Sequence, residues 1–127
     1  MEKVAIFSSS PKGKVKIPCS KSDAHRKIIA ASLCFNQRSV ISNVDISNDI
    51  RMTIEAMRAF ADIKEEGNKL IIEGKKPHES KGFFDAGESG STLRFLIPLF
   101  SYFFQSTEIK GSKRLLQRPL SIYEEIY

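Results

Sequence analysis

The feature of this sequence that most constrains its fold is an internal repeat. Shifting the chain against itself by 68 residues, without a gap, aligns identical residues in the two halves. Repetition at a fixed spacing is typical of a fold built from similar supersecondary units. We therefore predict two copies of one unit, although two generic helix–strand units could also align by coincidence. The matched pairs are Arg26 with Arg94, Ile29 with Ile97, Phe35 with Phe103, Gln37 with Gln105, Ile41 with Ile109, and Ile54 with Ile122.

Copy one is predicted to contain two helices, a strand and a hairpin. A serine or aspartate is available to cap the first helix, and Ser47 or Asn48 to cap the second. Apolar residues then recur at helical spacing, and Gly67 marks the hairpin turn. The expected elements are a loop at 18–22, a helix at 23–34, a strand at 39–44, a helix from 47 or 48 to about 60, and hairpin strands at 62–64 and 70–73.

Copy two repeats the first part of this order. We expect a strand at 83–86, a loop at 87–91, a helix at 92–104, a strand at 107–110 and a last helix at 120–127. Pro119 suits the first turn of that helix, whereas Pro98 should kink the preceding helix or shift its start. Copy two does not reach a hairpin, so we expect that the natural protein continues and that this chain is a fragment. The pattern predicts a mixed α/β fold.

Composition narrows the functional classes. Residues 1–40 hold eight Lys or Arg and two acids, and the whole chain carries a net charge of +5. Such a segment suggests an anionic partner, although a solvated basic surface is the simpler explanation. No apolar run reaches the roughly 18 to 20 residues of a membrane span, and no secretory signal is evident. We expect a cytoplasmic protein with no membrane partner, in which Cys19 and Cys34 are reduced thiols without zinc or a disulfide.

The loop before the first helix could bind an oxyanion. Free amides at a helix start attract anions, Lys21 supplies a mobile charge, Ser22 a hydroxyl, and Arg26 a guanidinium that can fork onto a phosphate. The alternative is a capped surface helix with ordinary charges. We expect His25 to decorate the surface of this helix rather than to act as a base, and His78 to lie in a polar linker.

Copy two has an equivalent Gly/Ser-rich loop. Gly90 would let the backbone approach a ligand, Ser91 follows it, and Arg94 lies at the same helical depth as Arg26. The loop lacks the Gly-Lys-Ser/Thr ending of a P-loop. A third cationic stretch at 113–118 ends in Arg118, although a solvated basic loop is its usual meaning. Equivalent loops of a repeat tend to emerge on one side, so we expect these charges to converge.

Four segments together resemble a known family. They are PCSKSDAHR, SNDIRMTIEAM, GESGSTLRFLIPL and GSKRLLQRP, and they occur in this order. They resemble the N-terminal motifs of 5-enolpyruvylshikimate-3-phosphate synthases. The resemblance implies βαβαββ repeats of the alpha-beta prism type, here one full repeat at about 19–80 and a truncated second at about 83–127. It also implies that 19–127 is a partial N-terminal domain, and that 1–18 holds a strand belonging with the C-terminal domain and loose or re-paired here.

The resemblance further implies an activity and a set of contacts. The family transfers the enolpyruvyl group of phosphoenolpyruvate to the 5-hydroxyl of shikimate 3-phosphate, without a metal or organic cofactor. Lys21 resembles the lysine that touches both substrates and is the one catalytic candidate. The other implied contacts are Ser22 and Arg26 with shikimate 3-phosphate, Gly90 with phosphoenolpyruvate or the inhibitor glyphosate, Arg118 with phosphoenolpyruvate, and Ser91 and Arg94 in support.

Some expectations concern what this chain can do alone. The family's acid and base carboxylates would lie beyond Tyr127, so we expect the isolated chain to bind weakly and not to turn over. Glu88 stands where many members have asparagine and should repel an anion unless it is turned away or paired, for example with Arg94. The apolar helix from Leu93 should promote self-association.

Two alternatives remain at this point. One is the related enolpyruvyl transferase that acts on UDP-N-acetylglucosamine. The other is a basic nucleic-acid-binding module, which we disfavour because an interleaved aromatic and basic surface motif is lacking.

Overall fold

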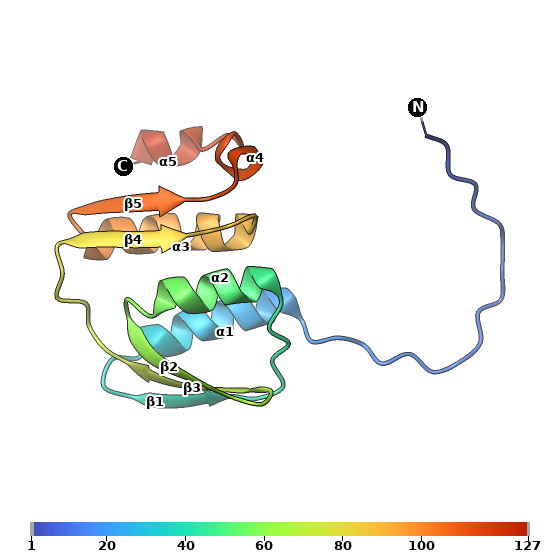
Figure 1. Ribbon diagram of the computed structural model, residues 1–127, viewed down its shortest axis with the longest axis horizontal. Coiled ribbons are helices and arrows are strands. Elements are labelled where there is room, and N and C mark those ends of the chain that lie inside the picture. Colours follow the sequence, from blue (N-terminus) through green and yellow to red (C-terminus); the bar gives the residue numbers. More distant parts are fainter. Residues whose placement is uncertain (1, 127) are drawn as a thin grey trace.

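The computed structural model describes residues 2–126, and a pair of helices from the first half of the chain lies between a three-stranded sheet and the second half (Figure 1). The first half contains all three antiparallel strands. Its elements are α1 (Lys21–Leu33), β1 (Arg38–Ile41), α2 (Asn48–Met57), β2 (Ala61–Glu66) and β3 (Lys69–Gly74). The second half contains β4 (Lys81–Asp85), α3 (Gly90–Phe103), β5 (Ser106–Lys110), α4 (Lys113–Leu116) and α5 (Ser121–Ile126).

The sheet of the first half has the order β1-β3-β2, with every pair antiparallel. Ile63 on β2 lies opposite Ile72 on β3. Both are buried and face α1 and α2, because side chains alternate between the two faces of a strand. The helices therefore have this sheet on one side and the second half of the molecule on the other (Figure 1).

The second half is a β-α-β unit. Strands β4 and β5 pair in parallel, with Phe84 opposite Ile109, and α3 makes the crossover between them. The starts of α1, α3 and α4 lie at the same side of the molecule (Figure 1). This arrangement brings the three expected anion-binding segments towards one another.

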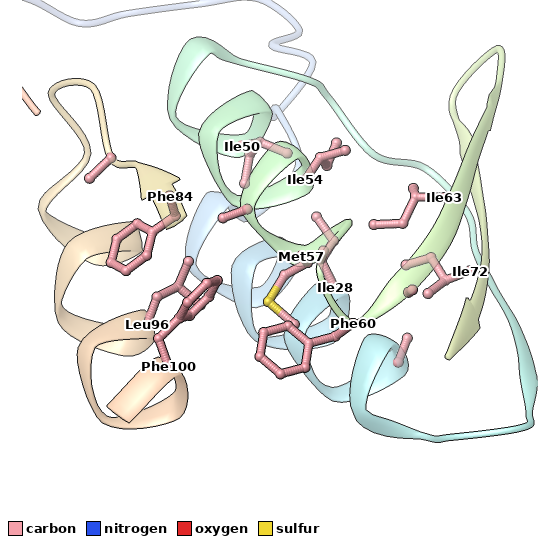
Figure 2. Packing of buried hydrophobic residues seen from close by; sticks show 14 of the residues in the cluster. Ile28, Ile50, Ile54, Met57, Phe60, Ile63, Ile72, Phe84, Leu96 and Phe100 are labelled. Carbon is pink, nitrogen blue, oxygen red and sulfur yellow. The ribbon is translucent and has the colours of Figure 1, made fainter. Parts of the chain in front are cut away.

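A row of aromatic rings joins the halves. Phe60, which follows α2, packs edge-on against Phe100 of α3 with ring centroids 5.2 Å apart, and Phe84 of β4 lies 4.7 Å from Phe100. Ile28 and Met57 continue this core towards the three-stranded sheet (Figure 2). Buried aromatic pairs of this kind contribute about 1 kcal/mol beyond the area that they bury.

Pro98 lies inside α3, and the helix continues through it to Phe103. Proline has no amide hydrogen, so the carbonyl of Arg94 loses its usual partner four residues later. The hydroxyl of Tyr123 donates a hydrogen bond to that carbonyl at 3.2 Å. Pro98, which was expected to disturb α3, thus leaves a carbonyl free to accept the hydrogen bond that holds α5 against α3.

The mixed α/β class and most expected elements are confirmed, with some corrections. Helix α1 begins at Lys21 rather than residue 23, because the Ser20 side chain caps it. The stretch expected as a basic loop contains helix α4, capped by Ser112. Residues 2–20 contain no strand and run away from the body (Figure 1). The expected last residue of the final helix, Tyr127, lies outside the described residues.

The repeat itself stays a prediction. Strand β5 corresponds to β1 at the 68-residue offset, and α3 corresponds to α1 within a residue or two. The sheets differ, however, because β1 pairs antiparallel and β5 pairs in parallel. The domain boundaries, 1–18 and 19–127 with repeats at about 19–80 and 83–127, likewise stay predictions. No helix within residues 2–126 is long and apolar enough to cross a membrane.

Candidate anion-binding site

The start of α1 presents unpaired amides beside a serine and an arginine. Ser20 caps the helix, and its hydroxyl oxygen accepts from the amide of Asp23 at 3.3 Å. Within the described residues, no hydrogen bond is found to the amides of Lys21 and Ser22. Such amides and the positive end of the helix dipole favour an anion. Arg26 lies one turn further along and is exposed.

The start of α3 has the same design. The Ser89 hydroxyl oxygen accepts from the amide of Thr92 at 3.1 Å, which leaves the amides of Gly90 and Ser91 without a protein partner in the described part of the chain. The serine is buried, so the cap is fixed by the interior of the molecule. Two helix starts, one from each half, therefore offer amides at one side of the fold.

Arg118 reaches the start of α3 from the end of α4. The buried side chain of Leu115 anchors this short helix, and the carbonyl of Leu115 accepts a hydrogen bond from the Arg118 amide at 3.1 Å. A Cβ atom on Gly90 would lie 2.9 Å from Nη1 of Arg118. The absence of a side chain at Gly90 is therefore what lets the guanidinium lie against the helix start.

These elements enclose a groove of about 580 Å³. Six of the seven residues singled out from the sequence line it, and Lys21 is the exception. The lining residues are Ser22, Arg26, Glu88, Gly90, Ser91, Arg94, Phe95 and Arg118. The convergence expected from the repeat is observed, while the binding roles of these residues stay predictions.

Among the described residues, the groove arginines have no ion-pair partner. Arg51 and Arg58, elsewhere on the surface, are ion-paired with Glu65, and the hydrogen bond from Arg51 lowers the pKa of that carboxyl. By contrast, no ion pair within residues 2–126 involves Arg26, Arg94 or Arg118. Three unpaired guanidinium groups around one hollow create a positive potential that attracts an anion.

Lys21 lies just outside the groove lining. Its Nζ donates a hydrogen bond to Oδ2 of Asp49, in the first turn of α2, at 2.7 Å. The side chains keep 55% and 33% of their exposure, so solvent weakens the pair and an incoming anion can compete for the lysine. No local sequence pattern indicates this partner, because Asp49 is 28 residues away.

Glu88 is the one carboxylate among residues 2–126 that lines the groove. It is exposed, and the pairing with Arg94 suggested for it is not found among the described residues. It also borders a smaller recess of about 150 Å³ with Ser112, Arg114, Leu115 and Arg118. Glu88 therefore borders both the groove at the start of α3 and the recess that Arg114 and Arg118 line.

The two histidines have opposite environments. His25 was expected on the surface of the first helix and this is wrong, because only 1% of it is exposed. Burial lowers the pKa of His25, while Asp49 raises it and Lys21 lowers it further. His78 lies exposed in the connection between the halves, as expected.

Comparison with known proteins identifies the family. The model of the family described as EPSP synthase (3-phosphoshikimate 1-carboxyvinyltransferase) matches residues 8–123. The chain belongs to the EPSP synthase family. It is 48% identical to the 3-phosphoshikimate 1-carboxyvinyltransferase of Clostridium perfringens, and 42% identical to that of Clostridium kluyveri, each over the whole of this chain. The enzyme of Brachyspira hyodysenteriae is 39% identical over 91% of it.

The similarity covers a limited part of each relative. The chain spans 30% of the length of the Clostridium enzymes and 28% of the Brachyspira enzyme. The groove of this EPSP synthase family member is thus formed by residues that match one part of those longer chains. Within residues 2–126, no group of three or more His, Cys, Asp or Glu is arranged to hold a metal ion, and both cysteines are free.

Proposed function

We propose that this chain supplies a substrate-binding groove for transfer of the enolpyruvyl group of phosphoenolpyruvate to the 5-hydroxyl of shikimate 3-phosphate. The observation that carries the proposal is the groove itself, which combines two helix starts with three arginines that have no partner in the described residues. Both substrates carry a phosphate and a carboxylate. A site that removes these anions from water needs cations and amides to replace the lost hydration.

The roles follow from position and from the family resemblance. Ser22 and Arg26, at the start of α1, bind shikimate 3-phosphate. Gly90 and Arg118, on the opposite wall, bind phosphoenolpyruvate, whose small size suits the close approach between them. Ser91 and Arg94 support this wall. Arginine suits these positions because its planar fork matches phosphate and carboxylate oxygens.

Lys21 is the candidate for contact with both substrates. The reaction joins the 5-hydroxyl oxygen to C2 of phosphoenolpyruvate, adds a proton to the methylene carbon, and removes one from the hydroxyl. Phosphate then leaves, and the new methyl group loses a proton. These steps need groups that both donate and accept protons. Among the described residues Glu88 is the one carboxylate lining the groove, so we expect the isolated chain to bind substrates without turnover.

Binding is tested by titrating the isolated chain with shikimate 3-phosphate while recording amide NMR spectra. We expect shifts at Ser22, Gly90 and Ser91, and about a tenfold loss of affinity for Arg26→Gln, since hydrogen bonds to charged groups contribute about 1.5–3 kcal/mol. Arg38→Gln, on β1 outside the groove, is the matched control. Equal binding by both variants would contradict the proposal.

The same titration separates the alternatives. UDP-N-acetylglucosamine should produce no saturable shifts at the groove. A nucleic acid should bind only weakly and lose affinity steeply with salt, as expected of non-specific binding to phosphates. A phosphate-release assay with both substrates completes the test, and turnover by the isolated chain would overturn the expectation that it only binds.

We also propose three properties that concern the surroundings of the site. Glyphosate should displace phosphoenolpyruvate at Gly90 and Arg118, which a competition titration would detect. The second half exposes Tyr102, Ile122 and Ile126, at 82%, 69% and 66%, so the chain should self-associate, as sedimentation at rising concentration would show. A cytoplasmic location is expected, and fractionation of cells that express the chain would test it.

A further inference from the structure

A chain of buried hydroxyl groups lies beneath the groove and ends on a histidine. His25 and Ser89 are 1% exposed, and Thr53 and Thr92 are fully buried. His25 comes from α1, Thr53 from α2, and Ser89 and Thr92 from the start of α3. His25 immediately precedes the groove residue Arg26, and Ser89 immediately precedes Gly90. The chain therefore connects the two walls of the groove from below.

The distances define a continuous path. Nδ1 of His25 is 2.7 Å from Oγ1 of Thr53, which is 2.8 Å from Oγ1 of Thr92. The Thr92 hydroxyl donates to Oγ of Ser89 at 2.8 Å. The same Ser89 oxygen accepts from the Thr92 amide and so caps α3. A longer contact of 3.4 Å from the Thr92 hydroxyl to the carbonyl of Asp49 competes with the serine but does not change the direction of donation.

Each hydroxyl has one proton, and this fixes the direction of the path. Because Thr92 donates to Ser89, its oxygen must accept from Thr53. Thr53 then has no proton left for His25, so the histidine must donate from Nδ1. Nε2 of His25, which is buried and has no hydrogen-bond partner in the described residues, is then an unprotonated acceptor. If the hydrogen bonds ran in the reverse direction, Nε2 would carry a buried N–H group without a partner. Such an N–H group is rarer and costs more free energy than a buried acceptor without a partner.

We propose that His25 is a positioning residue, which donates from Nδ1 into the Thr53–Thr92–Ser89 chain and so sets the distance between the two walls of the groove. This inference rests on the proposed function, because the groove is taken to bind phosphate or carboxylate groups. His25 does not touch the ligand. His25 instead holds the start of α3 through Ser89, the residue that caps this helix. The free amides of Gly90 and Ser91 are thereby placed opposite Ser22 and Arg26 before a ligand binds.

A polar connection suits this task better than an apolar contact. Hydrogen bonds have narrow preferences in distance and angle, whereas apolar side chains slide and repack at small cost. A fully connected buried network also strengthens each of its members in a medium of low polarity. The start of α3 depends on such fixation, because no common sheet joins the strands of the two halves.

The first experiment determines the tautomer. Nitrogen-15 NMR of the ring of His25, on the isolated chain near neutral pH, should show Nδ1 protonated and Nε2 unprotonated. Exposed His78 is the internal reference and should show the mixture of an unrestrained imidazole. A protonated Nε2 with a bare Nδ1 would reverse the path and overturn the proposal.

The second experiment tests positioning. Asparagine can place an amide nitrogen near the Nδ1 position, whereas leucine cannot. We expect His25→Leu to weaken binding of shikimate 3-phosphate roughly fivefold, the value of one net hydrogen bond, and His25→Asn to restore most of it. Thr53→Val should resemble the leucine variant, and Thr53→Ser the wild type.

The control is Ser32→Ala. Ser32 is equally buried in α1, but its hydroxyl donates to the carbonyl of Ile28 within the same helix and joins nothing across the groove. This variant should lose stability without losing affinity. If His25→Asn binds as weakly as His25→Leu, or Ser32→Ala weakens binding equally, His25 has only a structural role.

The two proposals fail in different ways. If the wild-type chain binds neither substrate, the proposed function fails, but the positioning proposal can still be judged. It then requires that His25→Leu and Thr53→Val change the amide shifts of Gly90 and Ser91 and speed hydrogen exchange at the amide of Thr92. Unchanged shifts and exchange would overturn it. Variants that do not fold are replaced by Thr92→Ser against Thr92→Val, read in the same way.

Discussion

The two halves of the molecule share one kind of helix start but are held together differently. Each contains a serine-capped helix that bears an arginine about one turn from its start, Arg26 in α1 and Arg94 in α3. In the first half a three-stranded sheet covers α1 and α2, whereas in the second half α3 is accompanied by two strands and by two short helices with exposed apolar residues. The binding chemistry thus resides in the shared helix starts, and the packing behind them differs.

The difference is also visible at the groove. Ser22 in copy one corresponds to Gly90 in copy two at the 68-residue offset. The first position provides a hydroxyl, and the second leaves room for Arg118. A repeated unit can therefore form two different walls of one site. The residue at this position sets whether a ligand meets the hydroxyl of Ser22 or the guanidinium group of Arg118, which comes from the end of α4.

The largest expected effect concerns the tightest point in each half. A Cβ atom on Gly74 would overlap the backbone carbonyl of Cys34, whereas one on Gly82 would lie 2.7–2.8 Å from the rings of Phe104 and Phe100. Backbone cannot move as rings can. We expect Gly74→Ala to lower the free energy of unfolding by about 3 kcal/mol or more, and Gly82→Ala by about 1–3 kcal/mol. Urea unfolding followed by circular dichroism measures both.

A larger loss of stability for Gly82→Ala than for Gly74→Ala would show that the second half is the more rigid one and would contradict the comparison. Gly67→Ala is a useful reference, since nothing lies within 4 Å of its Cβ position and only the left-handed φ of 60° opposes the change. It should cost about 1 kcal/mol.

The two walls of the groove should differ in which ligand loses affinity when one of them is changed. Gly90→Ala should displace Nη1 of Arg118, which would lie 2.9 Å from the new methyl group. Because the end of a flexible side chain can move away, stability should change by less than about 0.5 kcal/mol. Binding of phosphoenolpyruvate should fall about tenfold, and that of shikimate 3-phosphate less. Calorimetric titration of both ligands checks this, and equal losses would contradict separate roles for the walls.

The buried histidine makes stability depend on pH. Burial lowers the pKa of His25 below its ordinary 6.5, so the unfolded chain binds the proton more readily than the folded one. Its contribution is fully present above pH 6.5 and is lost as the pH falls from there to the lower folded pKa. Unfolding free energies measured across this range should decline with falling pH in the wild type.

His25→Asn should lack this part of the decline. His78→Asn, which alters the exposed histidine, should keep it. If the unfolding free energy of His25→Asn declines with falling pH as steeply as that of the wild type, other titrating groups cause the decline.

The smallest effect is expected where the last helix meets α3. Tyr123→Phe removes the hydroxyl that donates to the carbonyl of Arg94 and leaves that acceptor to solvent. The bond is exposed, so we expect a loss of only about 0.5–1 kcal/mol. Faster hydrogen exchange in α5, with α1 unchanged, would confirm that the bond fastens only the second half. Tyr102→Phe is the matched control, as Tyr102 is 82% exposed.

Much of the site was predictable because its parts are local. Helix starts, their caps and an arginine one turn later can all be found within seven consecutive residues. The interior was less predictable. His25 was expected on the surface, since nothing near it in the sequence indicates that Thr53 lies beside it. Helix α4 was missed because four residues are too few to show helical periodicity.

The order of the elements other than α4, the mixed α/β class and the set of cations available to an anion follow from the amino-acid sequence. Each depends on neighbours within a turn or two, where capping, periodicity and residue type act directly. Three features depend on how the chain packs: Arg118 lies against Gly90, Lys21 pairs with Asp49, and His25 joins α1 to α3 through Thr53 and Thr92. Those contacts join residues 28 to 39 positions apart, and they exist because burying the shared apolar core brings the helices together.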